Sequence, residues 1–149
     1  MLRVGDFAPD VSAEDSDGKA WSLTDALGRG EVVMYFYPAD FTPVCTREAC
    51  AFRDVYTELD AANVQIVGIS PQGAASHQRF REQYALPFPL LADERKEIVR
   101  AFGVDGPFGF GVRRVTFLIG TDRRIVNRVV ADFSVGSHMD LIKEVIAAR

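Results

Sequence analysis

Apolar residues along this chain fall into four dense runs, separated by stretches in which apolar positions recur every three or four residues. Three of the runs are almost continuously apolar and rich in β-branched and aromatic residues, as buried strands are: Val32–Tyr37, Val64–Ser70 and Val115–Ile119. The fourth run, Ile125–Val130, also has a strand-like composition. The runs predict a central sheet, and Thr121–Arg124 predicts a hairpin turn between the last two strands.

The stretches between these runs have the spacing of helices. In Cys45–Leu59, the apolar residues Phe52, Val55, Tyr56 and Leu59 fall on one helical face. Similar patterns predict helices over Ala74–Tyr84, Glu94–Phe102 and Ser137–Ala147. Strands that alternate with helices indicate an α/β fold. We expect one domain over residues 1–149, because the chain contains neither a repeat nor a polar stretch long enough for a linker.

The segment Gly103–Gly111, with the sequence GVDGPFGFG, predicts a loop with large backbone freedom. Such a loop could cradle a phosphate group. It lacks the lysine and the following helix of a P-loop, however, and it leads into a predicted strand. We therefore favour a mobile connection near the functional site.

Composition and charge disfavour several classes of partner. The 149 residues are 48% hydrophobic, which is enough to fill the core of one domain. The net charge of −4 leaves no basic face, so nucleic acid is not expected as a partner. The chain begins without the apolar stretch of a signal peptide, and no apolar run approaches the roughly 18 residues of a membrane span. We expect a cytoplasmic protein that does not associate with membranes.

Cys45 is the first candidate for chemistry, because it lies where a helix is expected to begin. Thr42 is a favoured N-cap residue and Pro43 suits the first helical position, so Cys45 falls at about the third residue of the helix. Helix N-termini and nearby cations lower the pKa of a thiol, and the thiolate is the nucleophile. Lowering a thiol pKa from about 8.5 to about 6 requires roughly 3 kcal/mol, whereas a helix terminus supplies about 0.3–1 kcal/mol. A reactive Cys45 therefore needs a further donor, for which we expect an arginine; the alternative is a small buried hydrophobe.

Cys50 is the only other cysteine in the chain. On an ideal helix, positions five apart are rotated by about 140° and their Cα atoms are about 8.6 Å apart. A disulfide requires Cα atoms within about 6.8 Å of each other. Cys45 shares the core-facing side of the helix with Phe52, whereas Cys50 points towards the other face. A bridge between the cysteines would require the first helical turns to unwind; the alternative is an isolated surface or partly buried thiol.

The residues around Cys45 form the pattern P-x-x-x-T-x-x-C, from Pro38 to Cys45, which resembles the peroxidatic motif of the peroxiredoxins. The resemblance continues through VGDFAPDV, the hairpin-like segment Gly18–Leu23, YFYP, CTREACAFRD, VVGIS, FPLLAD and RVTFLI. A second cysteine five positions after the first is similar to the atypical two-cysteine group known as peroxiredoxin Q or bacterioferritin comigratory protein. The resemblance implies a thioredoxin-like fold with an N-terminal extension and a central mixed sheet flanked by helices.

The resemblance also implies the roles of the two cysteines. Cys45 would attack the terminal O–O bond of hydrogen peroxide or an organic hydroperoxide and become a sulfenic acid. Cys50 would condense with that sulfenic acid to form an intramolecular disulfide. Thioredoxin or a similar dithiol protein would then reduce the bridge. The group usually has glycine where this chain has Val44, which would stiffen the turn that must unwind.

The same resemblance assigns residues that would assist Cys45. Thr42 would hydrogen-bond to the thiolate and the peroxide oxygen, and Pro38 would shape the pocket, although a strand terminator accounts equally well for this proline. Arg114 would stabilise the thiolate and polarise the peroxide; its spacing to Thr116-Phe117 favours it over the neighbouring Arg113. Glu48 would orient this arginine, or else be an exposed acid that complements the helix dipole.

Two further expectations concern cofactors and assembly. The resemblance implies a thiol-dependent peroxidase that uses no metal, haem or flavin, and a monomer rather than an oligomer. His77 and His138 lie far from the motif, and we expect both at the surface. The alternatives to a two-cysteine peroxidase are a one-cysteine peroxidase and a redox-sensing interaction module. The absence of a C-x-x-C motif argues against a disulfide oxidoreductase.

Overall fold

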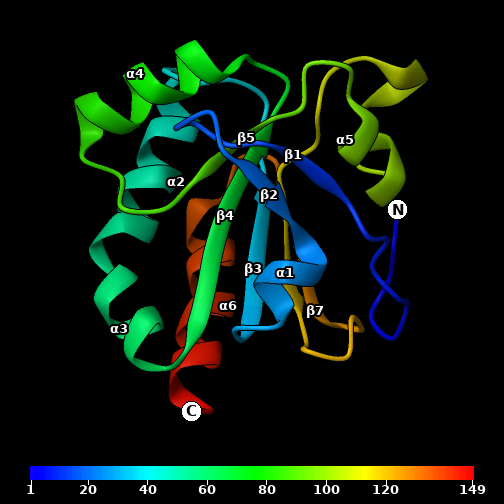
Figure 1. The fold of residues 1–149 in the computed structure, drawn as a ribbon, viewed down its shortest axis with the longest axis vertical. Helices are drawn as coiled ribbons and strands as arrows, with labels where there is room; N and C mark the ends of the chain where they lie inside the picture. The colour runs from blue at the N-terminus through cyan, green and yellow to red at the C-terminus, as the bar shows by residue number, and fades with distance from the viewer.

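The computed structural model describes residues 1–149 and has the predicted mixed α/β architecture (Figure 1). The strands are β1 (Ser12–Glu14), β2 (Ala20–Ser22), β3 (Glu31–Phe36), β4 (Val64–Ser70), β5 (Leu90–Ala92), β6 (Val115–Ile119) and β7 (Ile125–Val130). The helices are α1 (Leu23–Leu27), α2 (Pro43–Asp54), α3 (Tyr56–Ala61), α4 (Ala74–Tyr84), α5 (Glu97–Phe102) and α6 (Val135–Ala147), with a short 3-10 helix, η1 (Pro107–Gly109). No helix is both long and apolar enough to cross a membrane.

The central sheet has five strands in the order β5-β4-β3-β6-β7. β3 is parallel to β4 and antiparallel to β6, so the sheet is mixed, as predicted. In the antiparallel pair, Phe36 at the end of β3 lies opposite Val115 at the beginning of β6. The exit of β3 and the approach to β6 therefore meet at one edge of the sheet.

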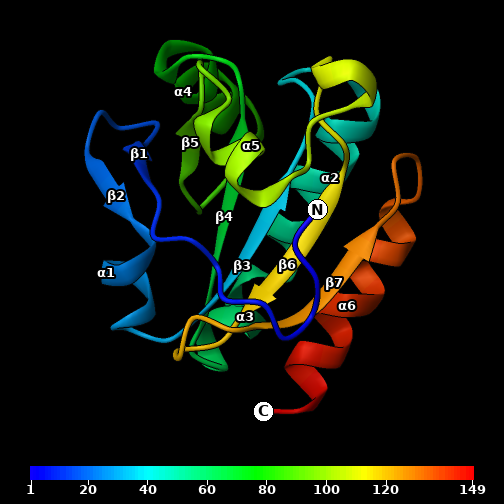
Figure 2. The same cartoon turned by 90° about the vertical axis from the view of Figure 1, so that its right-hand side faces the viewer.

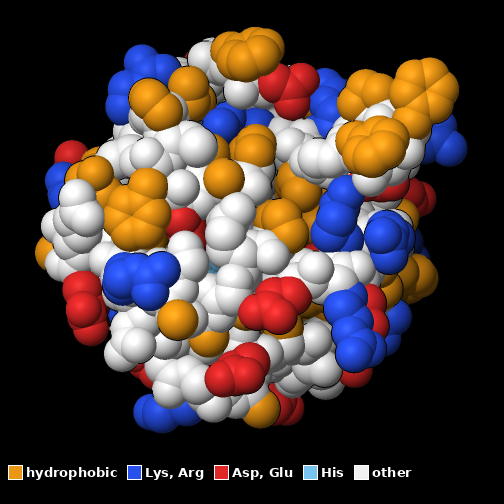
Figure 3. All heavy atoms as spheres, turned by 90° about the horizontal axis from the view of Figure 1, so that it is seen from above, with side chains coloured by type: hydrophobic (Ala, Val, Ile, Leu, Met, Phe, Trp, Pro, Cys, Tyr) orange, Lys and Arg blue, Asp and Glu red, His pale blue; other side chains and the backbone are white.

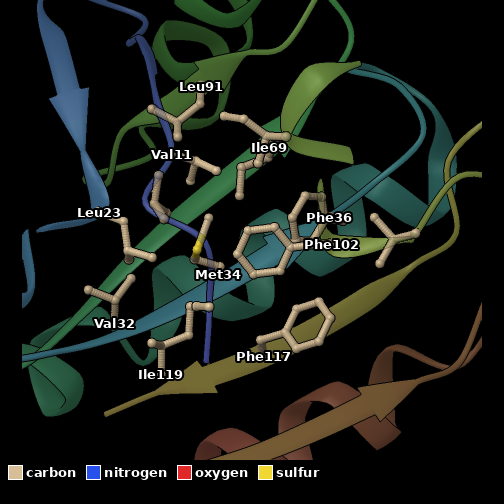
Figure 4. Close-up of a cluster of buried hydrophobic side chains, with 14 of the residues drawn as sticks. Val11, Leu23, Val32, Met34, Phe36, Ile69, Leu91, Phe102, Phe117 and Ile119 are labelled. Carbon is tan, nitrogen blue, oxygen red and sulfur yellow. The ribbon is translucent and has the colours of Figure 1, made fainter. Parts of the chain in front are cut away.

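Helices cover both faces of this sheet. In Figure 1, α1 lies in front of the sheet and α6 behind it, and Figure 2 shows β1, β2 and α1 set to one side as the expected N-terminal extension. One buried cluster packs α1 and α5 against residues such as Met34 and Phe36 of β3 (Figure 4). The other cluster packs α2, α4 and α6 against Val33 and Tyr35 of the same strand. Successive side chains of β3 thus enter opposite cores, which explains why this strand is apolar throughout.

Several predicted boundaries agree with the structure. β4, β6, β7 and α4 have the predicted limits, the hairpin between β6 and β7 is present, and α6 begins two residues before its predicted start. The first predicted strand, Val32–Tyr37, is shifted by one residue. The short elements β1, β2, β5 and α1 have too few residues to show a periodicity.

Two predicted helices were wrong in extent. The helix predicted over Cys45–Leu59 is two helices, because Val55 leaves the helical conformation with φ −107° and ψ 5°. The helix predicted from Glu94 begins at Glu97, since Lys96 takes a left-handed conformation with φ 58°. The carboxylate of Asp93 accepts the amide hydrogens of Ile98 and Val99 and so fixes the beginning of α5.

Candidate active site

Cys45 lies at the third position of α2, as predicted, and only 1% of its surface is exposed. α2 begins at Pro43 after Thr42, which occupies the N-cap position. The Thr42 side chain does not cap the helix; its hydroxyl instead donates to the carbonyl oxygen of Ala39 at 2.8 Å. Because this hydroxyl has one hydrogen, its oxygen remains able to accept a further hydrogen bond.

Arg114 reaches Cys45 because its backbone immediately precedes β6, which begins beside the end of β3. Its Nη2 donates to the Sγ atom of Cys45 at 3.2 Å. Its Nη1 donates to Oε1 of Glu48 at 2.8 Å, and its Nε donates to the carbonyl oxygen of Asp132 at 3.0 Å. These three contacts fix the guanidinium plane in a site where Arg114 is only 4% exposed.

The neighbouring Arg113 takes a different position. It forms an ion pair with Asp132 at 2.9 Å, and both side chains are 38% exposed. Hydrogen bonding to Arg113 holds the pKa of Asp132 below its ordinary value. The other carboxylate oxygen of Asp132, Oδ1, accepts the backbone N–H of Arg114 at 3.1 Å. Asp132 thus anchors the backbone from which Arg114 extends, and the structure places Arg114 rather than Arg113 against the thiol.

Glu48 is fully buried beside Arg114, one turn after Cys45 on α2, and is not an exposed acid. Its Oε1 is paired with Arg114, but its Oε2 has no hydrogen-bond partner. Burial raises the pKa of Glu48 to about 7, although Arg114 acts in the opposite direction. A carboxyl group with a raised pKa keeps its proton in the folded protein at a pH where the unfolded chain has lost it.

The raised pKa of Glu48 predicts a pH dependence of stability. The contribution of the Glu48 carboxyl group to the free energy of unfolding is fully present below its unfolded pKa of 4.5. This contribution is lost as the pH rises through about 7, the pKa in the folded protein. Relative to a Glu48→Gln variant, the wild type should lose about 3 kcal/mol of unfolding free energy between those values. Urea unfolding of both proteins at several pH values measures this difference. A constant difference across the range would contradict the assignment.

Both histidines are buried, so their expected surface positions were wrong. His138 on α6 is 0% exposed; its Nδ1 lies 2.7 Å from the Thr116 hydroxyl and its Nε2 lies 2.9 Å from the carbonyl oxygen of Ala131. Burial lowers the pKa of His138. His77 on α4 is also 0% exposed, with Nε2 at 3.0 Å from the carbonyl oxygen of Leu91. Each imidazole can be buried because both of its nitrogens have polar partners.

His77 belongs to a buried polar cluster around Asp40, in the loop between β3 and α2. The Asp40 carboxylate accepts the Tyr37 hydroxyl at 2.6 Å and the Ser76 hydroxyl at 2.8 Å. Nδ1 of His77 lies 2.7 Å from the same carboxylate. The next residue, Phe41, has a φ of 65°, a conformation that costs energy for a residue with a side chain. The Asp40 cluster therefore holds a strained loop in place just before Thr42.

Replacing Asp40 by asparagine should destabilise the fold by about 1–3 kcal/mol, because a buried charge-assisted network would become a weaker neutral one. Chemical denaturation of the variant checks the size of this effect. The exposed Asp54 supplies a matched control, since Asp54→Asn should change stability by less than about 0.5 kcal/mol. Equal effects of the two substitutions would show that the Asp40 cluster contributes no special stability.

A pocket of about 620 Å³ opens above Cys45. Its lining includes Pro38, Thr42, Cys45 and Arg114, so four of the five residues predicted for the site lie together. Residues of Gly103–Gly111 form another wall, which places this glycine-rich segment next to the site. Figure 3 shows this face of the molecule, where hydrophobic side chains gather among charged ones. Phe110 and Phe133, which also line the pocket, are 79% and 86% exposed.

Cys50 lies outside the pocket, on the same helix as Cys45. It is half-buried, and both cysteines are free thiols. Phe52 and Cys45 lie in the same core cluster, so the predicted core-facing position of Cys45 is confirmed. Joining the two cysteines requires a change in the first turns of α2.

Sequence reasoning missed the residues that support the site from a distance in the chain. Asp132, His77 and His138 belong to no local motif, and Asp40 occupies a variable position of the Pro38–Cys45 pattern; the contacts of Asp132, His77 and His138 join segments far apart in the chain. Patterns within one segment cannot reveal such contacts. A prediction of which strands pair would have helped to find these residues, because the pairing of β3 with β6 brings Arg114 and its neighbours to the start of α2.

The profile of the AhpC/TSA family matches residues 4–128. Putative peroxiredoxin Q of Oryza sativa subsp. indica, described as chloroplastic, is 46% identical over 119 residues, which cover 79% of this chain. The chain spans about half of that relative, 54% of its length. Peroxiredoxin Bcp of Escherichia coli K12 is 40% identical over 147 residues, covering 95% of this chain and 93% of the relative.

The fold shows the same relationship. The crystal structure of peroxidoxin BcpB from Mycobacterium tuberculosis superposes with a TM-score of 0.92 and 35% sequence identity, covering 99% of this chain and 98% of that one. The thioredoxin-like fold expected from the resemblance is therefore confirmed. Since the family profile covers most of the chain and relatives above 30% identity cover nearly all of it, the chain belongs to the AhpC/TSA family, within the group of peroxiredoxin Q and Bcp.

Proposed function

We propose that this protein is a thiol-dependent peroxidase in which Cys45 reduces hydrogen peroxide and organic hydroperoxides. The observation that supports this most directly is the contact of 3.2 Å between Nη2 of Arg114 and Sγ of Cys45 at the N-terminus of α2. A cation at that distance favours the thiolate, which is the nucleophilic form of cysteine. Arg114 is the further donor that the sequence analysis required, because a helix terminus alone supplies too little free energy to activate the thiol.

In the first step, the Cys45 thiolate attacks the terminal oxygen of the hydroperoxide. An S–O bond forms and the O–O bond breaks, so that sulfur is oxidised to a sulfenic acid and the peroxide is reduced. The leaving alkoxide or hydroxide takes up a proton and departs as an alcohol or water. Thr42 Oγ1 can accept the hydrogen of the terminal peroxide oxygen, because its own hydrogen is donated to Ala39. Arg114 offers N–H groups to the charge that develops on the peroxide.

In the second step, the Cys50 thiol attacks the Cys45 sulfenic acid, which forms an intramolecular disulfide and releases water. The first turns of α2 unwind for this step, because both cysteines lie on one helix. The segment that unwinds lies between two anchored parts of the chain. The Asp40 cluster precedes α2, and Phe52 is buried later in the same helix. Thioredoxin or a similar dithiol protein then reduces the bridge and restores both thiols.

The pocket supports the inclusion of organic hydroperoxides. It holds about 620 Å³, which is far larger than hydrogen peroxide requires, and Pro38, Phe110 and Phe133 give it apolar walls. We further propose that residues 1–149 form a single domain that acts as a monomer. A cytoplasmic location stays a prediction, because the relatives include both bacterial Bcp and chloroplastic peroxiredoxin Q.

Mass spectrometry tests this function after the reduced protein receives one equivalent of peroxide. The expected product is a monomer with a peptide that links Cys45 to Cys50, and sustained peroxide consumption should follow when thioredoxin, its reductase and a nicotinamide donor are supplied. A Cys50→Ser variant should instead stop at the sulfenic acid. The proposal is rejected if the wild type consumes peroxide no faster than the solution without protein.

A further inference from the structure

One buried cation, Arg114, lies between two acidic groups at the beginning of α2. Its guanidinium donates to Sγ of Cys45 at 3.2 Å and to Oε1 of Glu48 at 2.8 Å, and none of the three residues is more than 4% exposed. In a buried site one cation offsets one anion, and a second unpaired anion is costly. When Cys45 is a thiolate, Glu48 must therefore keep a proton or gain a second cationic partner.

His138 provides that second basic group on the far side of Glu48. Its Nδ1 lies 3.8 Å from Oε2 of Glu48, the carboxylate oxygen that has no hydrogen-bond partner. Its Nε2 faces the carbonyl oxygen of Ala131, which can only accept, so Nε2 bears a hydrogen. Its Nδ1 faces the hydroxyl of Thr116, which can donate or accept. Nδ1 is therefore free to exist with or without a proton.

We propose that Glu48 and His138 share one buried proton while Cys45 is a thiolate, which makes His138 a positioning residue for peroxide reduction. With this proton in place, the charge of Arg114 is directed to the thiolate and to the peroxide. Once the proton is lost, the Glu48 carboxylate competes for the same guanidinium. The inference rests on the proposed peroxidase function, which it deepens by adding a residue that acts through Glu48.

The other ionisable groups around the pair do not offer an alternative place for this proton. Burial raises the pKa of Tyr35, on β3, well above its ordinary value, so its phenol stays protonated. Asp132, which follows β7, stays a carboxylate because Arg113 lowers its pKa. Burial raises the pKa of Glu48 to about 7 and lowers that of His138, so burial favours the proton on the carboxyl group over the imidazole. A proton shared between such groups belongs to the pair.

This coupling has a kinetic signature. The rate constant for peroxide reduction should fall at higher pH as the pair of Glu48 and His138 loses its proton. Binding linkage is reciprocal, so the thiolate must also raise the proton affinity of the pair. Removing the negative charge at position 45 should therefore lower the pH at which His138 titrates.

Stopped-flow measurement of peroxide reduction from about pH 5 to pH 9 tests the kinetic signature, with the Cys50→Ser substitution in every protein so that only Cys45 reacts. His138→Gln should move the alkaline fall to lower pH, because one of the two proton-holding groups is gone. Glu48→Gln should remove the alkaline fall, since its side chain stays neutral. His77→Gln is the matched control, because this buried imidazole faces Asp40, and the position of the alkaline fall should not move. An unmoved fall in His138→Gln, or a persistent one in Glu48→Gln, overturns the proposal.

NMR of the His138 imidazole supplies a measurement on a protein with the native cluster and no peroxide. Between the reduced wild type and Cys45→Ser, the titration of His138 should shift to lower pH by about one unit or more. An identical titration in the two proteins overturns the proposal, even where His138→Gln fails to fold. This readout needs no turnover, so a shift without peroxide reduction would reject the peroxidase function alone.

Discussion

Replacing Cys45 by serine is expected to reduce the rate of peroxide reduction by at least about 10⁴-fold, which corresponds to roughly 5 kcal/mol of transition-state stabilisation. A serine hydroxyl remains protonated beside Arg114, whereas a thiol in the same place ionises and is intrinsically far more nucleophilic. The substitution removes no core volume of consequence, so the pocket and the buried pair of Arg114 and Glu48 should persist. The expected loss is therefore one of chemistry and not of folding.

The measurement is peroxide consumption under single-turnover conditions, with the circular dichroism spectrum and unfolding midpoint of each variant recorded alongside. Cys50→Ser is the matched control, because it removes the other thiol from the same helix. It should reduce one equivalent of peroxide at a wild-type rate and then fail in sustained turnover with thioredoxin. If Cys45→Ser retained the first turnover and Cys50→Ser lost it, the roles of the two cysteines would be reversed.

The order of events at the site follows from its construction. Cys45 is activated by a helix whose first turns must unwind before Cys50 can reach it. In the proposed cycle, the folded form therefore reacts with peroxide and a locally unfolded form makes the disulfide. Val44, at the second position of α2 and in the wall of the pocket, belongs to the segment that must unwind in the proposed cycle. Its β-branched side chain restricts the backbone there, which gives this chain a stiffer hinge than glycine would.

Local patterns predicted the parts of the site that are close together in the sequence. Thr42, Pro43 and Cys45 take their positions from the beginning of one helix, and their spacing was sufficient to place them. The need for a cation also followed from the sequence, because the free energy available at a helix terminus is too small. Choosing between Arg113 and Arg114 required either the resemblance or the structure, since two adjacent arginines before a strand cannot be distinguished by residue type.

The remaining parts depend on contacts across the sheet, which one segment cannot encode. Glu48 fitted both an exposed acid and a buried partner of arginine until the position of Arg114 was known. His138 was wrongly expected at the surface because its partners, Thr116 and Ala131, lie on other elements. The helix predicted over Cys45–Leu59 failed for a different reason, because its apolar spacing continues through the break at Val55. Periodicity shows which face of a segment is buried, but not whether the backbone remains continuous.

The contact between Arg114 and Cys45 places a full positive charge next to the sulfur. At the distance of 3.2 Å and an effective dielectric constant of about 20, two unit charges attract by about 5 kcal/mol. Glu48 accepts a hydrogen bond from the same guanidinium at 2.8 Å, so the net attraction between Arg114 and the thiolate is smaller than this value. The attraction acts only on the ionised form of the sulfur, so it favours the nucleophilic state of the residue.

Replacing Arg114 by alanine is accordingly expected to slow peroxide reduction by about 10³-fold, or roughly 4 kcal/mol, because two effects are lost together. The thiolate loses its cation, and the peroxide loses the N–H groups that stabilise its developing charge. These effects can be separated, since alkylation of Cys45 by iodoacetamide depends on the thiolate but requires no donor to a peroxide. Alkylation at neutral pH should fall by less than about 30-fold, so the two rates should diverge.

Arg114→Lys is the matched variant, because it retains a positive charge that cannot form the three directed contacts to Cys45, Glu48 and Asp132. It should preserve more of the alkylation rate than of the peroxide rate, and it also avoids leaving Glu48 buried without a cation. Measuring both rates in both variants separates activation of the thiol from polarisation of the substrate. If peroxide reduction and alkylation fell by the same factor in each variant, Arg114 would act on the thiolate alone.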